Sequence, residues 1–252
     1  MSRYRAFGIH LLISSFVFIA FLLIMLRVWY PDFYFEASAG WGVLKILLMV
    51  DVVLGPLITL IIFKSGKPGL RFDLSVLAFL QLSALAYGAS VIYENRPLYL
   101  VFAADRFEVI PAGAIDVAEI KDPGSLTSPD SRPPMVFANR PEDPEQRGEI
   151  AMEVILGGKD IELRPALYSP FMEHIDAVLS KGVDIVALMQ RDERSSQQIE
   201  SFAAAQNSKP GDYSYYPLIG KNKDMLAVLS ASDGSWSGVI DINPWVGASP
   251  GD

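Results

Sequence analysis

Residues 50–63, VDVVLGPLITLIIF, decide the fold of this chain, because they form the middle of an apolar run long enough to cross a membrane. Two features interrupt the run. Asp51 places a carboxylate among Val and Leu side chains, and Gly55-Pro56 follows about one helical turn later. A helix that served only as an anchor would need neither the acid nor the break. These residues are therefore the first candidates for a function.

The chain is expected to contain three membrane-spanning helices. Crossing a hydrocarbon layer of about 30 Å takes about 20 mostly apolar residues, and segments 7–29, 41–63 and 74–93 meet that requirement. The first is expected to be retained rather than cleaved as a signal peptide, because its apolar stretch is long and MLRVWYPD offers no small-residue cleavage site. Residues 1–93 are therefore predicted to form a membrane domain in contact with the lipid bilayer.

Positive charges predict the orientation of these helices. Arg3 and Arg5 precede the first span, and Lys64, Lys67 and Arg71 lie between the second and third, whereas the loop PDFYFEASAG has no Lys or Arg. Since cytoplasmic loops carry the excess of these residues, the N-terminus is expected in the cytoplasm and everything after residue 93 outside it. Aromatic residues that favour membrane interfaces fall at the expected outer surface: Trp29, Tyr30, Tyr34, Trp41 and Tyr93.

The remainder of the chain, residues 94–252, is expected to form a small α+β extracytoplasmic domain. Residues 1–93 carry a net charge of +3, which leaves −11 for this part of a chain whose total is −8. Such an acidic domain repels nucleic acid, so no nucleic-acid partner is expected. Residues 121–148 hold six prolines and predict a long Pro-rich loop. Three strand-like runs follow near the C-terminus, with Asp233-Gly234 as a hairpin signal, and predict an antiparallel meander.

Asp51 is the sharpest candidate for a binding role. It lies near the middle of the second span, where an acid costs about 2.5–3.5 kcal/mol and usually faces protein rather than lipid. Two explanations stay open at this stage. Asp51 could hydrogen-bond Gln81 or Ser83 of the third span, or it could contact the helix of a partner protein. A direct pair with Lys45 is possible but strained, because Lys45 lies six residues earlier and can extend outward.

The Gly-Pro break could also serve either packing or binding. Gly55 lies one turn from Asp51 on the same helix face, and Pro56 has no N–H, which leaves the carbonyl of Val52 free and predicts a kink. Together they would form a notch that another helix could approach closely. Gly88, four residues after Ala84 in the third span, is a second small residue that permits close helix contact. The partner-binding candidates are Asp51, Gly55, Pro56, Lys45, Gln81 and Gly88.

The residue inventory argues against catalysis and against a cofactor. The chain has no Cys and two His residues, His10 and His174, which nearly excludes a thiolate, a His-based metal site or a triad. Intramembrane proteolysis by aspartates needs two carboxylates that share a proton, and Asp51 is the only acid deep inside an expected span. We therefore expect a protein that is not an enzyme and binds no metal.

Several segments resemble a known family. RYRAFGIHLLISS, WYPDFYFEASAGW, LKILLMVDVVLGPLITLIIF, GKPGLRFDLSVLAFLQLSALAYG and RPLYLVFAADRFEVI are similar, in this order, to the N-terminal half of the TfpX/TfpZ type IV pilin accessory proteins. The closing YYPLIGKNKDMLAVLSASDGSWSGVIDINPW is similar to the end of that family. The resemblance implies a bacterial inner-membrane protein that acts as an accessory factor for a cognate type IV pilin. It implies no catalytic residues.

Two functions of different classes follow. The first is a membrane-embedded chaperone or assembly factor, in which spans two and three hold the apolar helix of the pilin and the outer domain binds its head. The second is a sensor or regulator whose outer domain binds a ligand and signals through the spans. The short segments expected in the cytoplasm, about six residues before the first span and about ten between the second and third, leave no room for an output domain and favour the first.

Overall fold

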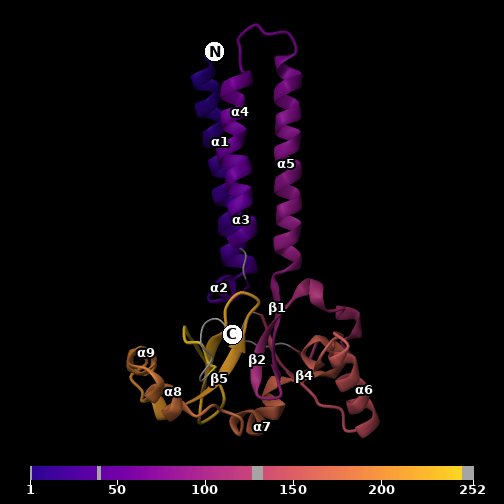
Figure 1. The fold of residues 1–252 in the computed structure, drawn as a ribbon, viewed down its shortest axis with the longest axis vertical. Coiled ribbons are helices and arrows are strands. Elements are labelled where there is room, and N and C mark those ends of the chain that lie inside the picture. The colour runs from indigo at the N-terminus through magenta and orange to yellow at the C-terminus, as the bar shows by residue number, and fades with distance from the viewer. Residues whose placement is uncertain (1, 39–40, 127–132, 246–252) are drawn as a thin grey trace. The chain divides into compact units, whose positions relative to one another are not determined.

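The computed structural model describes residues 2–38, 41–126 and 133–245. The chain divides into two compact units (Figure 1). The first comprises Met1–Phe35 and Ala39–Arg96, and the second comprises Glu36–Ser38 and Pro97–Asp252. A short helix, α2 (Tyr34–Ser38), contributes its last three residues to the second unit.

The first unit consists of long apolar helices, drawn from indigo to magenta in Figure 1. Helix α1 (Arg3–Ile24) continues into a π-helical turn, η1 (Met25–Trp29). The second rod joins α3 (Trp41–Leu47), the π-helical η2 (Leu48–Leu54) and α4 (Gly55–Ile62), and α5 (Leu70–Glu94) is the third. Three stretches, Arg3–Trp29, Trp41–Ile62 and Leu70–Glu94, are long and apolar enough to cross a membrane. The prediction of three such helices is confirmed, with ends that differ by a few residues.

One end of this unit is held by aromatic residues. The Tyr30 hydroxyl donates a hydrogen bond to the Ile92 carbonyl oxygen at 2.7 Å, and the rings of Trp29 and Tyr93 meet edge to face with centroids 5.2 Å apart. These contacts join the end of η1 to the end of α5. The buried side chains around them form the core of this end: Met25, Tyr30, Phe35, Leu44, Leu47 and Ile92.

The second unit is built on a seven-stranded sheet with the strand order β4-β3-β1-β2-β5-β6-β7. Its strands are β1 (Pro97–Ala103), β2 (Arg106–Pro111), β3 (Met135–Ala138), β4 (Tyr168–Pro170), β5 (Tyr213–Ile219), β6 (Met225–Ser230) and β7 (Trp236–Ile240). The pairs β1–β3 and β2–β5 are parallel, and the other neighbours are antiparallel.

The expected C-terminal meander needs correction. Strands β5, β6 and β7 do pair antiparallel in chain order, and Gly234 adopts a φ of 70° in the turn before β7. They are not a separate antiparallel sheet, however, because β5 also pairs in parallel with β2. The sheet as a whole is mixed. This pairing joins residues more than one hundred positions apart, and local sequence carries no signal for it.

The Pro-rich stretch 121–148 is more regular than a loop. Residues 127–132 of it lie outside the described residues, but Met135–Ala138 forms β3, which pairs with β1 and β4. Helix α6 (Pro144–Ile155) then begins inside the stretch, with the Asp143 carboxylate accepting a hydrogen bond from the Glu145 N–H at 3.0 Å. Proline at the first helical position lacks only an N–H that the helix would not use. Pro144 therefore stands at the start of a helix rather than in a loop.

Further helices cover the sheet of the second unit. Figure 1 shows α6 on the side of β4, and α8 and α9 toward the other end. The α-helices are α7 (Ile175–Leu179), α8 (Ile185–Arg191) and α9 (Glu193–Ala205). Short 3-10 helices lie in the connections of this unit: η3 (Ala112–Ala114), η4 (Val117–Glu119), η5 (Ile161–Leu163), η6 (Pro165–Leu167), η7 (Phe171–His174) and η8 (Pro210–Asp212).

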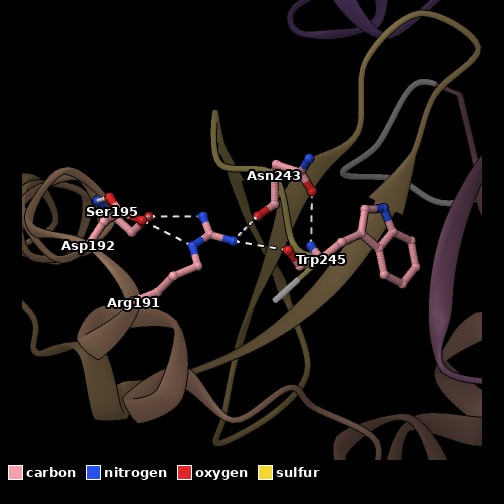
Figure 2. Close-up of polar contacts among 5 residues, drawn as sticks. All are labelled: Arg191, Asp192, Ser195, Asn243 and Trp245. Atoms are coloured by element: carbon pink, nitrogen blue, oxygen red, sulfur yellow. Dashed lines mark hydrogen bonds and ion pairs between the residues drawn. The ribbon is translucent and has the colours of Figure 1, made fainter. Parts of the chain in front are cut away.

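A polar network around Arg191 fixes the segment after β7 against α8 and α9. Figure 2 shows its guanidinium between the two parts of the chain: Nη1 donates to the carbonyl oxygens of Asn243 and Trp245 at 2.9 and 3.2 Å. On the other side, Nε donates to Asp192 at 3.0 Å and Nη2 donates to Ser195 at 3.1 Å. Because Asp192 also accepts hydrogen bonds from Ser195, its pKa is lowered to about 2.

Candidate functional site

The second apolar helix carries an acid, a glycine and a threonine on one buried face. Asp51, Gly55 and Thr59 are spaced four residues apart and are all buried in the first unit. Side chains at this spacing lie one above another on a helix. The face therefore presents a carboxylate, a gap without a side chain, and a hydroxyl in sequence along the helix.

The helix is locally π-helical next to Pro56. In η2 the Gly55 N–H donates to the carbonyl oxygen of Val50, five residues earlier, rather than to the residue four back. Pro56 then stands at the start of α4. A proline cannot donate to the preceding turn and its ring crowds the carbonyl there, and a π-helical turn is a known way to absorb that break. Asp51 lies in the middle of this turn.

Two other helices contribute polar groups to the same face. The His10 Nδ1 of α1 lies 2.6 Å from the Thr59 Oγ1, within hydrogen-bond distance. From α5, the Gln81 Nε2 donates a hydrogen bond to the backbone carbonyl oxygen of Asp51 at 3.2 Å. The carbonyl is free to accept this bond because the π-helical turn displaces the usual backbone partners. All three apolar rods therefore meet around this face.

The glycines allow the helices of this unit to pack closely. A Cβ built on Gly55 would lie 2.0 Å from Gln81 Nε2, and one built on Gly88 would lie 2.7 Å from Leu47 Cδ2. Neither position has room for a side chain without movement of its neighbour. Gln81 thus fills the space beside Gly55, and Leu47 fills the space beside Gly88.

The Asp51 carboxylate has no such match. Its residue is 8% exposed, and both carboxylate oxygens are buried without a hydrogen-bond partner among the described residues. Lys45 is exposed and makes no ion pair with it, and Ser83 is exposed as well. A buried polar group that is left unpaired costs about 1–3 kcal/mol, and more when charged. The structure therefore contains an uncompensated group at the centre of this site.

The sequence indicated several residues of this site, whose role in partner binding stays a prediction, and one contact was not predicted. It singled out Asp51, Gly55, Pro56, Gln81 and Gly88, and the structure brings them to the interfaces between the rods. It did not predict the contact between His10 and Thr59. A His and a Thr in otherwise apolar helices are a signal that could have been followed, since polar side chains in such helices usually bond across to a neighbour.

His174, the histidine of the second unit, has structural contacts. Among the residues that the structure describes, no group of three or more His, Asp or Glu side chains could hold a metal ion. His174 of η7 instead stacks on Phe137, with centroids 4.2 Å apart, and its Nε2 lies 2.8 Å from the Ser169 Oγ. The ring stacking and the hydrogen bond connect η7 to β3 and β4.

Three known proteins with similar sequences are named fimbrial assembly proteins. No family model matches the chain, and no solved structure matches it. The chain is 30% identical over 179 residues to the fimbrial assembly protein of serogroup E1 of Dichelobacter nodosus, covering 68% of each chain. The serogroup I protein of that organism gives the same identity and coverage. The protein of its serogroups C1 and C2 is 33% identical over 115 residues, 45% of this chain and 88% of the relative.

These similarities extend over more than two thirds of the first two relatives and of this chain. The chain belongs to the family of these fimbrial assembly proteins.

Proposed function

We propose that this protein is a membrane-embedded, non-catalytic accessory factor that stabilises a cognate type IV pilin or promotes its assembly into pili. The names of the relatives support a role in pilus assembly, and the resemblance to TfpX/TfpZ segments supports the pilin as the protein served. In this proposal the protein resides in a bacterial inner membrane, with its N-terminus in the cytoplasm and the sheet domain in the periplasm, as the distribution of Lys and Arg favours.

The observation that carries the proposal is the unpaired Asp51 carboxylate. Ionisable residues within membrane helices are costly and usually face a functional pathway or a partner. A partner helix that brought a hydrogen-bond donor or a cation to this depth would satisfy Asp51 and gain affinity from it. The second and third apolar helices would hold the apolar helix of the pilin, and the sheet domain would bind its globular head.

Two measurements on Asp51 variants, unfolding temperature and pilin copurification, separate a packing role from a binding role. Asp51→Leu removes an unpaired buried carboxylate, so the purified protein should unfold at the same temperature as wild type or a higher one. If Asp51 binds the pilin helix, the amount of pilin that copurifies from membranes should fall about tenfold or more, as for a lost contact of about 1.4 kcal/mol or more. Asp51→Asn, which still hydrogen-bonds, should retain part of the binding.

Asp73→Asn is the matched control, since Asp73 is an acid outside the buried face and pairs with Lys67 at 2.6 Å. It should leave pilin recovery unchanged. Wild-type pilin recovery and normal piliation with Asp51→Leu would refute the role of Asp51 in recognition. Absence of pilin from the wild-type preparation, with a crosslinker present, would refute the proposed function itself.

A further inference from the structure

The second unit contains a cleft of about 720 Å³ between α6, η5 and the turn that joins β1 to β2. This volume is in the range that accommodates a small ligand or a few side chains of a peptide. Much of its wall is aliphatic, with Ile150, Val154 and Ile155 from α6 and Ile161 from η5. Apolar side chains therefore have a place to bind here.

Glu162 is the buried charged residue of this cleft. It is 8% exposed and lines the cavity, and among the described residues it forms no ion pair. The neighbouring cation, Arg106, is engaged elsewhere: its Nε lies 2.7 Å from the Glu108 Oε1. An acidic side chain thus lies in the wall of the cleft without a cation of its own.

The surroundings of Glu162 disfavour its charge. Burial is the main cause and the Glu108 carboxylate on β2 is the second, and together they raise the pKa of Glu162 to about 7. Asp160 acts in the same direction, while Arg106 and a backbone hydrogen bond oppose the shift. Tyr168 of β4 donates its hydroxyl to the Glu162 backbone carbonyl. A cation brought into the cleft would reverse this balance by stabilising the carboxylate.

The helix beside the cleft exposes apolar side chains. Met152, Ile155 and Leu156 lie three and four residues apart and thus on one face of α6, and Ile155 and Leu156 are 78% and 79% exposed. Figure 1 shows α6 on the β4 side of the sheet, away from α8 and α9. Such a contiguous apolar ridge on a water-exposed domain is typical of a protein interaction surface.

We propose that this cleft and the α6 ridge bind an apolar segment of a partner protein through a lysine side chain, with the lysine ammonium paired to Glu162. A lysine carries its charge on a four-carbon stem, which can lie along the Ile150, Val154 and Ile161 walls while its head reaches the carboxylate. Three further cations line the cleft: Arg140 and Lys181 are exposed to solvent, and Arg147 donates hydrogen bonds to the carbonyl oxygens of Pro141 and Glu142. This inference rests on the proposed function, in which the partner is the globular head of the pilin.

Binding of the lysine requires Glu162 to be ionised, which makes the affinity depend on pH. With a Glu162 pKa of about 7, roughly 3% of the carboxyl is ionised at about pH 5.5 and roughly 90% at about pH 8. The apparent affinity scales with this fraction. It should therefore rise about 30-fold between those pH values.

The first experiment tests the chemistry of the cleft without the pilin. The full chain in lipid nanodiscs, with its Ile methyl groups labelled, is titrated with the tripeptide Leu-Lys-Leu, and with Leu-norleucine-Leu as the uncharged control. The lysine peptide should shift the Ile150, Ile155 and Ile161 methyl signals at about pH 8 and do so far less at pH 5.5 or in Glu162→Gln. Equal shifts with both peptides, or no loss in Glu162→Gln, would overturn the assignment.

The second experiment tests the partner. Because the chain has no Cys, Ile155→Cys introduces a unique attachment point for a photocrosslinker on the ridge. Val186→Cys on α8, also exposed, is the control at the other end of the sheet. The ridge position should crosslink the pilin head at least fivefold more than the control, at a peptide containing a lysine. Equal crosslinking at the two positions would overturn the inference. The proposed function would still stand in that case if the pilin copurified with the protein. Lysine-peptide binding without any pilin capture would leave the cleft assigned and reject the pilin.

Discussion

The buried Glu162 predicts an unusual pH dependence of stability. Its pKa lies at about 7 in the folded protein against an ordinary 4.5, so the folded state holds a proton that the unfolded state has released between these values. Stability contributed by this proton is therefore complete below about pH 4.5 and is lost as the pH rises through about 7. The difference between a pKa of about 7 and the ordinary 4.5 corresponds to about 3 kcal/mol.

Glu162→Gln should abolish this loss, because Gln has the shape of the protonated acid and carries no charge. The difference in unfolding free energy between the variant and wild type should be about 3 kcal/mol larger at pH 8.5 than at pH 4. Urea titrations of the full chain in mild detergent, followed by near-UV circular dichroism, give this difference directly. Taking the difference cancels the other titrating groups.

Glu149→Gln is the matched control, since Glu149 is an exposed glutamate of α6. Its difference from wild type should stay within about 0.5 kcal/mol at both pH values, as for most surface substitutions. A flat difference for Glu162→Gln would mean that the carboxyl titrates normally, and the reasoning about its burial would be wrong. Stability rising with pH in wild type relative to Glu162→Gln would contradict the sign of the effect.

Three further substitutions test the packing of each unit. Gly88→Leu forces a side chain into the space that Leu47 occupies and should destabilise the apolar unit by about 1–3 kcal/mol, measured by thermal unfolding in detergent. Thr59→Val, which keeps the shape but loses the contact with His10, should cost about 0.6 kcal/mol in the same assay. Arg191→Met removes two hydrogen bonds to backbone carbonyls and should speed chymotrypsin cleavage after Trp245. An unchanged unfolding temperature for Thr59→Val, or an unchanged cleavage rate for Arg191→Met, would count against the contact concerned.

The apolar unit was predictable because its signal is local. Long apolar runs determine helices in a membrane whatever their neighbours are, and the small residues Gly55 and Gly88 marked the close contacts that the structure contains. The π-helical turn around Asp51 was not predictable in form. Pro56 indicated a break, but a kink and a π-helical turn both satisfy a proline.

The sheet domain was predicted less well because its order depends on distant pairings. Asp233-Gly234 marked a hairpin that the structure contains, since a Gly with a positive φ favours a tight turn. The parallel pairs β1–β3 and β2–β5 have no such mark. Strand β3 lies in a Pro-rich segment, and its four residues are too few to show a periodic pattern.

The burial of Glu162 could not be predicted from the sequence for a related reason. It lies in KDIELRP, a charged segment that resembles solvent-exposed surface. Its burial arises because η5 packs against β1 and β2. The burial therefore depends on a tertiary contact between segments about fifty residues apart. A charged residue in a polar segment gives no indication of such a contact. Burial of this kind becomes known only when the fold is known.

The structure separates the roles of two residues that lie one helical turn apart, Asp51 and Gly55. Gly55 has an explanation inside the protein, because Gln81 fills the space beside it and donates to the Asp51 backbone carbonyl. The Asp51 carboxylate has none among the described residues. We therefore assign packing to the glycine and propose recognition for the carboxylate.

Paired substitutions test this division of roles. Gly55→Ala must displace Gln81 and lose its hydrogen bond, so it should lower the stability of the apolar unit by about 1 kcal/mol or more while the folded fraction still retains pilin. Asp51→Leu should do the reverse, with an unchanged or more stable unit that no longer retains pilin. The measurements are thermal unfolding in detergent and pilin recovered per folded protein. If Gly55→Ala lost the pilin without losing stability, the space beside Gly55 would be the docking site, and the carboxylate would be only its neighbour.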